Sequence, residues 1–388
     1  MKNNKILNFI QKNTMMIVLV LVTLFFFWGT SGKILMPNNI TSIIAQNAYV
    51  FVLASGMLLC ILTGGNIDLS VGSVVCFAGA IGAVMIQNGM SPLLAVIVML
   101  VIGALIGAWQ AFWIAYIHIP PFITTLSGMM VFRGLSNVVL KGQTIPVANE
   151  TFVKIFGGGA NCYIPDIFHG NGINILCLVV GVVGTLIYLF ATIKNRSTRV
   201  KANQVVDAMP KFIAKTAVIA VVILFFTLKL AQYKGLPMSL IWVGIVIAIY
   251  SYITSKTTIG RHLYAVGGNE VATRLSGIDT RKVYFFAYTN MGFWAGLAGI
   301  LTIARLTSAA PSYGNNYEMD AIGSCFIGGA SAYGGIGTVP GVIVGAILMG
   351  VINIGMSIMG IDANYQKVVK GLVLLAAVIF DVVSKKKN

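Results

Sequence analysis

Apolar residues along the chain are gathered into about twelve long runs, separated by short polar or glycine-rich stretches. An α-helix needs ~20 apolar residues to cross the hydrocarbon core of a bilayer, and most of the runs approach that length. Because backbone groups in a bilayer must bond within their own segment, each run is predicted to be helical. The pattern therefore predicts an all-α polytopic membrane protein with about 10–12 transmembrane or re-entrant helices. The runs cover residues 14–32, 43–63, 70–88, 93–117, 122–140, 172–193, 213–231, 237–254, 283–304, 320–334, 339–358 and 365–383.

Composition supports the membrane class and bears on the meaning of the charge. Hydrophobic residues make up 57% of the chain and charged residues only 9%, which excludes a soluble globular domain. The formal net charge of +16 raises the question of nucleic acid. The basic residues, however, lie at the ends of apolar runs and not among aromatic residues of a solvated domain. They are better explained by the rule that Lys and Arg stay on the cytoplasmic side, and no nucleic-acid partner is predicted.

The distribution of Lys and Arg also predicts the orientation. Basic residues are concentrated near both ends of the chain, in the segment 194–215 and in the segment 256–282. The connections that would lie on the other side carry fewer of them. The asymmetry places both termini in the cytoplasm. The basic residues of the 194–215 segment are Lys194, Arg196, Arg199, Lys201, Lys211 and Lys215.

Three pairs of glycines stand four residues apart within apolar runs: Gly103/Gly107, Gly292/Gly296 and Gly341/Gly345. Such pairs let helix backbones approach closely, which matters where lipid gives helices no hydrophobic reason to associate. In a chain with 43 glycines some pairs also arise by chance. Each pair is therefore either a helix contact face or a coincidence.

Two polar stretches interrupt the apolar sequence, at 64–73 and at 317–324. Each places an acid before a short run of Gly, Ala and Ser, at 70–88 and at 320–334, and the sequence does not say whether these short runs cross fully. The predicted topology puts the two acids on opposite sides. Residues 43–140 and 283–383 are therefore predicted to be the halves of an inverted repeat within one transmembrane domain, 1–388. The polar residues concerned are Asn66, Asp68, Ser70, Ser73, Glu318, Asp320 and Ser324.

These acids, and one arginine, each allow two interpretations. Asp68 and Asp320 either line a translocation path, where acids are tolerated only against protein or water, or cap the helices that follow them. Arg133 is the basic residue well inside the 122–140 run. It either pairs with a carboxylate as part of the path or lies at an interface with its charged end in the polar region.

The segment 256–282 is polar, basic and helix-forming, and is predicted to present a docking surface in the cytoplasm. Glu270 and Arg274 stand four residues apart and can pair on one helix face. Gly267 and Gly268 would break the chain before this helix, and Gly277 would end it. Nowhere does the sequence hold a Gly-x-x-x-x-Gly-Lys-[Ser/Thr] motif or a catalytic grouping, so an enzyme is not predicted. If ATP drives the protein, the ATPase must be a separate chain.

The chain resembles the permease subunits of bacterial ABC importers for monosaccharides, the group that includes the ribose, galactose and xylose permeases. Five segments carry the resemblance: Gly64 to Ser73, Tyr264 to Ile278, Ala304 to Asp320, Gly328 to Gly341 and Tyr365 to Val378. It covers nearly the whole chain. The added basic loop and span at 190–235 is similar to the xylose and multiple-monosaccharide branch, and departs from the shorter ribose-type members.

The resemblance implies a transport subunit in the bacterial cytoplasmic (inner) membrane, not an enzyme. Two permease copies would enclose the path, an extracytoplasmic sugar-binding protein would dock outside and an ABC ATPase inside, with membrane lipid around them. ATP and magnesium would belong to the ATPase, and no cofactor to this chain. An ion-coupled secondary sugar carrier is the alternative function; the docking segment argues against it, since a carrier needs no separate motor. The residues implied to contact the ATPase are Gly268, Asn269, Glu270, Ala272, Thr273, Arg274, Leu275, Ser276 and Gly277.

Overall fold

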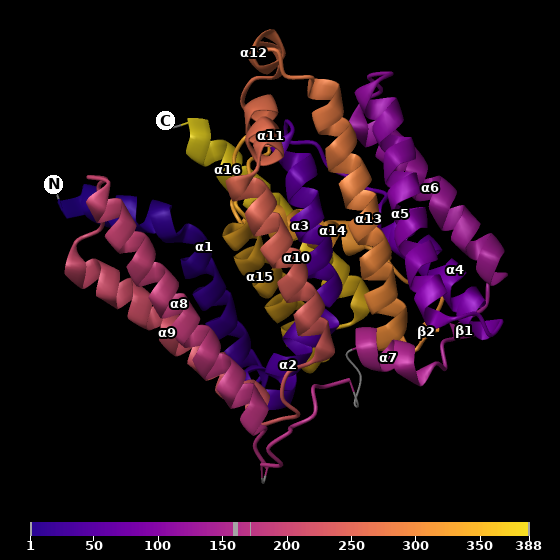
Figure 1. Ribbon diagram of the computed structural model, residues 1–388, viewed down its shortest axis with the longest axis horizontal. Coiled ribbons are helices and arrows are strands. Elements are labelled where there is room, and N and C mark those ends of the chain that lie inside the picture. The colour runs from indigo at the N-terminus through magenta and orange to yellow at the C-terminus, as the bar shows by residue number, and fades with distance from the viewer. Residues whose placement is uncertain (1, 158–161, 171, 387–388) are drawn as a thin grey trace. The chain divides into compact units, whose positions relative to one another are not determined.

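The structure, a computed structural model, describes residues 2–157, 162–170 and 172–386 (Figure 1). The chain is built from helices, and the predicted all-α membrane class is confirmed. Two short strands, β1 (Ile145–Pro146) and β2 (Ser308–Ala309), pair antiparallel. The helices are α1 (Lys2–Gly29), η1 (Lys33–Leu35), α2 (Pro37–Gln46), α3 (Ala48–Leu62), α4 (Val71–Gln87), α5 (Pro92–Ala115), α6 (Pro121–Leu140), α7 (Glu150–Phe156), α8 (Ile175–Lys201), α9 (Met209–Ala231), α10 (Met238–Lys256), α11 (Thr258–Gly268), α12 (Glu270–Leu275), α13 (Thr280–Leu306), α14 (Tyr317–Ile327), α15 (Val339–Ile358) and α16 (Ala363–Lys386).

Each apolar run of the sequence overlaps one of these helices. Among the described residues, six helices are long and apolar enough to cross a membrane, or up to seven if the bent pair α2 and α3 forms one span. The two glycine-rich runs are the shorter helices α4 and α14, with 17 and 11 residues. Their length falls below the ~20 residues of a full span. The inverted repeat remains a prediction.

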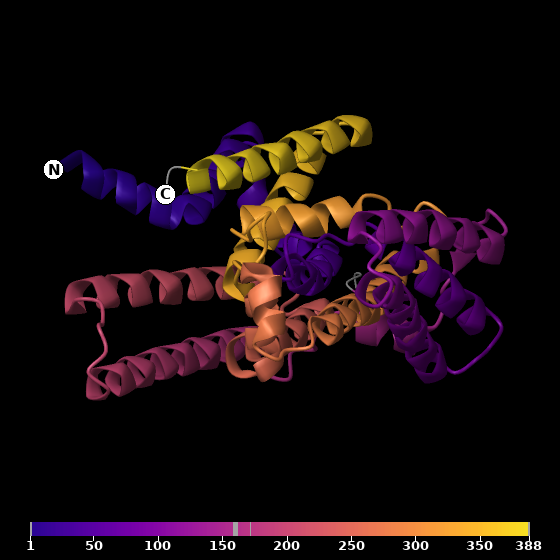
Figure 2. The same cartoon turned by 90° about the horizontal axis from the view of Figure 1, so that it is seen from above.

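The chain divides into two compact units, and the larger one comprises residues 1–34, 43–162 and 238–388. Its centre is α3, whose residues from Val50 to Leu62 are all buried. A helix that is apolar on every side has no face for water and belongs in a core. Figure 2 shows α3 nearly end-on, with α10, α13, α14 and α15 around it, and these helices contact it along its length.

Glycines allow the close contact between α5 and α13 in this unit. A Cβ atom added at Gly103 would overlap the carbonyl oxygen of Gly292, and one added at Gly107 would lie 2.5 Å from the carbonyl oxygen of Tyr288. Gly296 completes the same contact face. Close backbone approach allows van der Waals packing between helices that lipid would otherwise separate. The first two glycine pairs are thereby confirmed as contact faces.

The third glycine pair packs α15 against α14. A Cβ atom at Gly341 would overlap the carbonyl oxygen of Gly328, and one at Gly345 would overlap that of Ser324. The pair is therefore a contact face as well. It holds α15 against α14, the short helix that carries Asp320.

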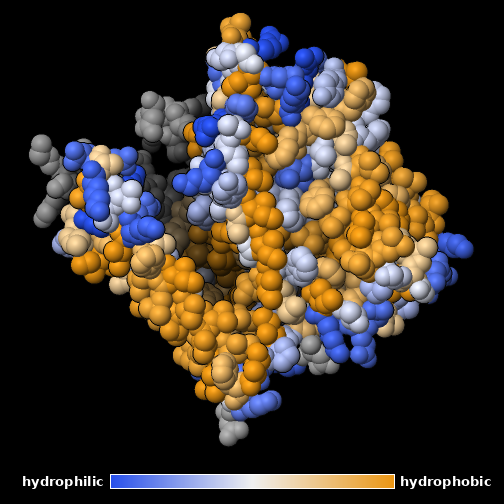
Figure 3. All heavy atoms as spheres, in the orientation of Figure 1, coloured by the Kyte–Doolittle hydropathy of each residue, from blue (hydrophilic) through white to orange (hydrophobic). Residues whose placement is uncertain are grey.

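The smaller unit comprises residues 35–42 and 163–237, and its main feature is the hairpin of α8 and α9. The additional loop and span predicted at 190–235 lie within this unit. Most side chains of the hairpin are exposed and apolar, and Figure 3 shows them as a hydrophobic band ending in a hydrophilic tip. The tip carries the basic residues of the 194–215 segment, where the carbonyl of Asp207 accepts from Arg196 at 2.6 Å and its carboxylate pairs with Lys211 at 2.9 Å.

The other end of the hairpin is organised by Asp166, which precedes α8. Slight desolvation would raise the pKa of this carboxyl, but four backbone N–H groups bind the carboxylate and lower the pKa to about 2. Two of the donors are Ile175 and Leu176, the first residues of α8, at 3.0 and 3.1 Å. A carboxylate at this position satisfies the free N–H groups of the helix start and complements its dipole.

Candidate functional site: a docking segment and two buried polar clusters

The docking segment predicted at 256–282 consists of two short helices, α11 and α12, joined at Asn269. The backbone of Asn269 is extended, with φ −162°, and its side-chain oxygen accepts from the N–H of Ala272 at 2.9 Å. This bond caps α12. At the other end Gly277 has φ +86°, and Ile278 N–H reaches back to the carbonyl of Thr273 at 3.3 Å, which is the Schellman way of ending a helix. The predicted end at Gly277 is therefore confirmed, whereas the break falls at Asn269, with Gly267 and Gly268 still inside α11.

The predicted pair of Glu270 and Arg274 does not form in the described residues. The carboxylate of Glu270 instead accepts from Thr280 Oγ1 at 3.2 Å and from Tyr284 Oη at 3.0 Å. The reason is tertiary, because the first turn of α12 faces the start of α13, while Arg274 points into solvent. Glu270 therefore attaches α12 to α13 and does not stabilise α12 from within.

The outer face of α12 is apolar although it is exposed. Val271 is 59% and Leu275 82% exposed, and Arg274 lies between them along the chain. Thr273, on the opposite side, is buried. The six-residue helix α12 therefore exposes apolar side chains to water. Exposed apolar surface of this kind is typical of a site that a partner covers. Figure 1 shows α12 projecting beyond the end of α13.

A glycine junction connects this segment to two distant loops. A Cβ atom at Gly267 would overlap the carbonyl oxygen of Leu62, and one at Gly65 would overlap that of Ala332. The N–H of Gly335 donates to the same Leu62 carbonyl at 3.1 Å. Three of the segments singled out in the sequence, at 64–73, 264–278 and 328–341, thus meet backbone to backbone. Side chains are excluded there, so the three segments pack through direct backbone contact.

Tyr284 adds a hydrogen-bonded link at this junction. Its hydroxyl lies 3.0 Å from the carboxylate of Glu270 and 3.0 Å from the backbone carbonyl of Thr63. A phenol carries only one hydrogen, so the two acceptors share it or alternate. Asn66 donates to the same Thr63 carbonyl at 3.2 Å. Tyr284 therefore connects α12 to the beginning of the polar stretch 64–73.

Asp279 marks the start of α13. Slight desolvation would raise the pKa of this carboxyl, but hydrogen bonding to Arg281 and the charges of Arg281 and Lys282 lower it. The two cations lie 3.2 and 3.8 Å from its oxygens. The backbone N–H of Arg281 also donates to it, at 3.2 Å, so Asp279 is the N-cap of α13.

Asp68 forms a buried polar cluster with Ser70 and Gln110. The carboxylate accepts from the N–H and the hydroxyl of Ser70, at 2.8 and 2.6 Å. Gln110, on α5, donates to the same hydroxyl at 2.7 Å. Ser70 is the residue before α4, so Asp68 binds the entrance of that helix and not an N–H inside it. Sequence reasoning missed Gln110, whose signal was a lone amide within an apolar run.

Ser73, one turn further on, has a buried hydroxyl without a hydrogen-bond partner among the described residues. It belongs to the first turn of α4, beside the Asp68 cluster. Because an unpartnered buried hydroxyl carries a desolvation cost, Ser73 is a candidate for contact with a ligand or water. Its role on a path remains a prediction.

Asp320 was expected to precede its helix, and this was wrong: α14 begins at Tyr317, and Asp320 lies within its first turn. The carboxylate is 1% exposed and pairs with Lys370 of α16, whose Nζ lies 2.9 Å from Oδ1 and 3.1 Å from Oδ2. Only the Oδ2 contact has the direction of a hydrogen bond, and Tyr49 donates to the same oxygen at 2.6 Å. Asp320 thus forms an ion pair and does not cap its helix. Its cation, Lys370, comes from the last apolar run of the sequence.

The other members of the second stretch lie close by. The backbone carbonyl of Asp320 accepts from the hydroxyl of Ser324 at 2.7 Å, and Glu318 is buried beside Gly72. The Asp68 and Asp320 clusters are separate networks. Among the described residues no group of three His, Cys, Asp or Glu residues lies close enough to hold a metal ion.

Arg133 lies within 4 Å of no carboxylate oxygen in the described part of the chain, although its charge acts on the buried carboxyl of Glu318. Its guanidinium donates to the backbone carbonyls of Pro311 and Tyr313, at 3.2 and 2.7 Å. Of the two interpretations, a direct ion pair with a carboxylate does not form, whereas a longer-range interaction with Glu318 does. Arg133 holds the irregular loop between β2 and α14, because carbonyl groups outside regular structure need donors and Arg supplies several.

Taken together, the fold and these sites define a multi-pass, all-α membrane protein with the short projecting helix α12 and buried polar clusters between its helices. The family described as "Branched-chain amino acid transport system / permease component" matches residues 39–378. The chain belongs to this family. It is a transport permease component and not an enzyme, as the sequence predicted.

Three named proteins show which members of the family the chain is similar to. The xylose transport system permease protein XylH of Escherichia coli (strain K12) is 32% identical over 380 residues, covering 98% of this chain and 93% of the relative. XylH of Haemophilus influenzae is 33% identical over 379 residues, covering 97% and 98%. The ribose import permease protein RbsC of Escherichia coli (strain K12) is 32% identical over 344 residues, covering 89% and 85%. No solved structure matches the chain.

Proposed function

We propose that this chain is the membrane-spanning subunit of an ATP-driven importer for a monosaccharide, xylose or a related pentose or hexose. Similarity to the xylose permeases over nearly the whole chain supports this substrate class, and the ribose permease is matched over less of the chain. ATP and magnesium would be bound by a separate ATPase. An extracytoplasmic binding protein would deliver the sugar to two copies of the permease in the cytoplasmic membrane.

The observation that carries the proposal is α12. Its exposed Val271 and Leu275 flank the cation of Arg274, and its inner side is fixed to α13 through Glu270. Arginine is among the residue types that contribute most to protein interfaces, and the exposed apolar side chains beside it would leave water on docking. The ATPase would bind this face, with residues 268–277 forming the contact.

The polar stretches would flank the sugar path. Asp68, Ser70 and Gln110 place hydrogen-bonding groups inside the helix bundle, and Ser73 adds an unpartnered hydroxyl. Hydroxyl, amide and carboxylate groups are the partners that a sugar's hydroxyls need. Asn66, Glu318, Asp320, Ser324 and Arg133 would support or border this path.

Reconstitution tests the function directly. Proteoliposomes that contain the permease, its ATPase and its binding protein should accumulate labelled xylose only when ATP is present on the ATPase side. Vesicles without the ATPase, or with a non-hydrolysable nucleotide, are the controls. Accumulation driven by a proton or sodium gradient without the ATPase would instead establish a secondary carrier.

Tyr284→Phe should impair coupling without impairing assembly. The change keeps the ring but removes the hydroxyl that links Glu270 to Thr63, so movement of α12 reaches the 64–73 stretch less directly. Loss of a hydrogen bond to a charged group, ~1.5 kcal/mol, lowers the population of the linked arrangement about tenfold, and uptake per ATP hydrolysed should fall by up to that factor. Tyr252→Phe, at an exposed position on α10, is the matched control. Equal uptake by both variants would show that the link is not used.

Ser197→Cys tests the proposed orientation. With both termini in the cytoplasm, the basic tip of the α8–α9 hairpin is cytoplasmic too, because Lys and Arg remain on that side. A cysteine at this position should therefore resist a membrane-impermeant thiol reagent in intact cells and react after permeabilisation. The native cysteines are all buried and give a low background. Rapid labelling of intact cells would show that the tip of the hairpin lies outside the cell, opposite to the proposed orientation.

A further inference from the structure

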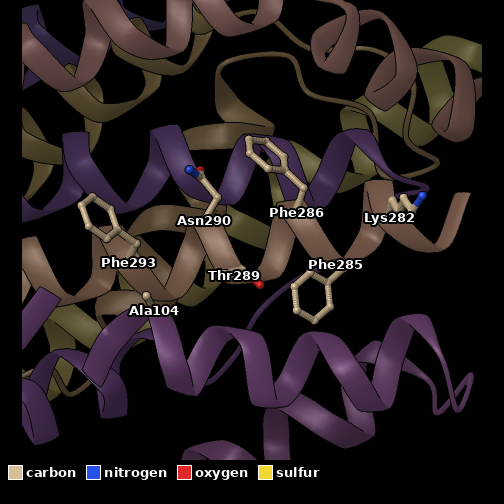
Figure 4. A pocket seen from close by; sticks show the side chains of 7 residues that line it. All are labelled: Ala104, Lys282, Phe285, Phe286, Thr289, Asn290 and Phe293. Atoms are coloured by element: carbon tan, nitrogen blue, oxygen red, sulfur yellow. The ribbon is translucent and has the colours of Figure 1, made fainter. Parts of the chain in front are cut away.

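A groove runs along one face of α13, beside α5 (Figure 4). It has a volume of about 380 Å³, is open to the surface, and extends from Lys282 at the start of the helix to Phe293. At a rise of 1.5 Å per residue these ends are ~16 Å apart along the helix axis. Figure 4 shows Phe285 and Thr289 on the side of α13 nearest Ala104, with Phe286 and Asn290 on the other side.

Water is a poor occupant of this groove. A stable buried water needs two to four polar partners, and the wall is made mostly of aromatic rings and aliphatic carbon. Of the two polar side chains in the middle, Asn290 already accepts from Tyr250 at 2.5 Å. The volume therefore suits a flexible apolar chain.

Two residues make the groove polar, one at its end and one near its middle. Lys282, at one end, is 78% exposed and lies 3.8 Å from Asp279, whose other oxygen is bound by Arg281 at 3.2 Å. Its ammonium thus retains donors for an anion. The hydroxyl of Thr289, seven residues further along, is buried and has no hydrogen-bond partner among the described residues. Such an orphaned donor calls for an acceptor from a ligand.

We propose that this groove is a binding site for an anionic glycerophospholipid. One acyl chain lies along Phe285, Phe286 and Phe293, an ester oxygen accepts from Thr289, and the phosphate binds Lys282. Lys282 and the aromatic wall thus supply the two kinds of contact that a phospholipid needs, a cation for the headgroup and an apolar surface for a hydrocarbon chain. Juxtamembrane cations attract anionic lipids, so phosphatidylglycerol should bind better than phosphatidylcholine.

Native mass spectrometry of the delipidated full chain, with phosphatidylglycerol or phosphatidylcholine added back, measures this binding without requiring transport. Wild type should retain one phosphatidylglycerol per chain more tightly than phosphatidylcholine. Lys282→Gln should reduce the preference for phosphatidylglycerol by about fivefold, the effect of one basic residue near the membrane surface. Ala104→Phe should lower retention of both lipids by filling the groove, and Ala104→Leu does the same with less bulk if the first variant fails to fold.

Two matched controls separate the groove from general effects. Lys201→Gln removes a cation at the end of α8, and Gly184→Leu adds bulk where a new Cβ atom meets nothing within 4 Å. Both should retain lipid as wild type does. If the Lys282 and Ala104 variants match these controls, the site does not exist. A disulfide between two chains carrying Ala104→Cys would also overturn the proposal, since a second copy would then occupy the groove.

Discussion

Replacing Lys370 with methionine is expected to destabilise the protein by about 3–5 kcal/mol, because it leaves the carboxylate of Asp320 buried without its cation. Asp320 is 1% exposed and the Lys370 side chain 17%, so solvent screens the pair little. Tyr49 still donates to the carboxylate but supplies no charge. The unfolding midpoint in detergent micelles, followed in a denaturant titration, measures the loss.

A second change should restore most of this stability. Asp320→Asn combined with Lys370→Met removes both charges and keeps an oxygen for the Tyr49 hydroxyl, so no buried charge remains. Lys367→Met, at an exposed position on the same helix, is the control and should leave the midpoint unchanged. If Lys370→Met behaved like Lys367→Met, the ion pair would contribute nothing to the fold.

Placing aspartates at Val271 and Leu275 together is expected to reduce ATP-dependent uptake by about 100-fold or more. Each substitution puts a charge where the proposed interface buries an apolar side chain, and burying an unpaired carboxylate costs on the order of several kcal/mol. The fold should survive, since the two side chains are 59% and 82% exposed in the isolated chain. Uptake in proteoliposomes and co-purification of the ATPase are the two measurements.

The control for this pair is Val205→Asp, in the turn between α8 and α9. Val205 is 96% exposed, and the turn is proposed to lie on the same side of the membrane, so a new charge there tests solubility and insertion alone. Normal uptake by Val205→Asp with loss in the α12 variant supports docking on α12. Wild-type uptake and ATPase binding by the α12 variant would exclude α12 as the contact.

The docking segment shows which structural features can be predicted from the local sequence. Asn269 as a cap and Gly277 as an end are encoded within a few residues, since capping depends on side chains and φ angles next to the helix end. The partner of Glu270 is not local. Its bonds run 10 and 14 residues ahead, to Thr280 and Tyr284, and depend on how α12 folds back on α13.

By itself the sequence determined the all-α membrane class and the approximate positions of the long helices, because hydropathy acts along one helix. It marked the three glycine pairs as candidates, and the packing of the helices then showed each to be a contact face. Only the tertiary structure decided which groups meet. Asp320 lies 50 residues from Lys370, Arg133 lies 180 from Tyr313, and Gln110 lies 40 from Ser70. An apolar pattern tells which segments leave water, but a buried polar group must be satisfied by whichever helix packs beside it. That neighbour is chosen by the packing of the whole bundle, so the partners of the buried charges became visible only in three dimensions.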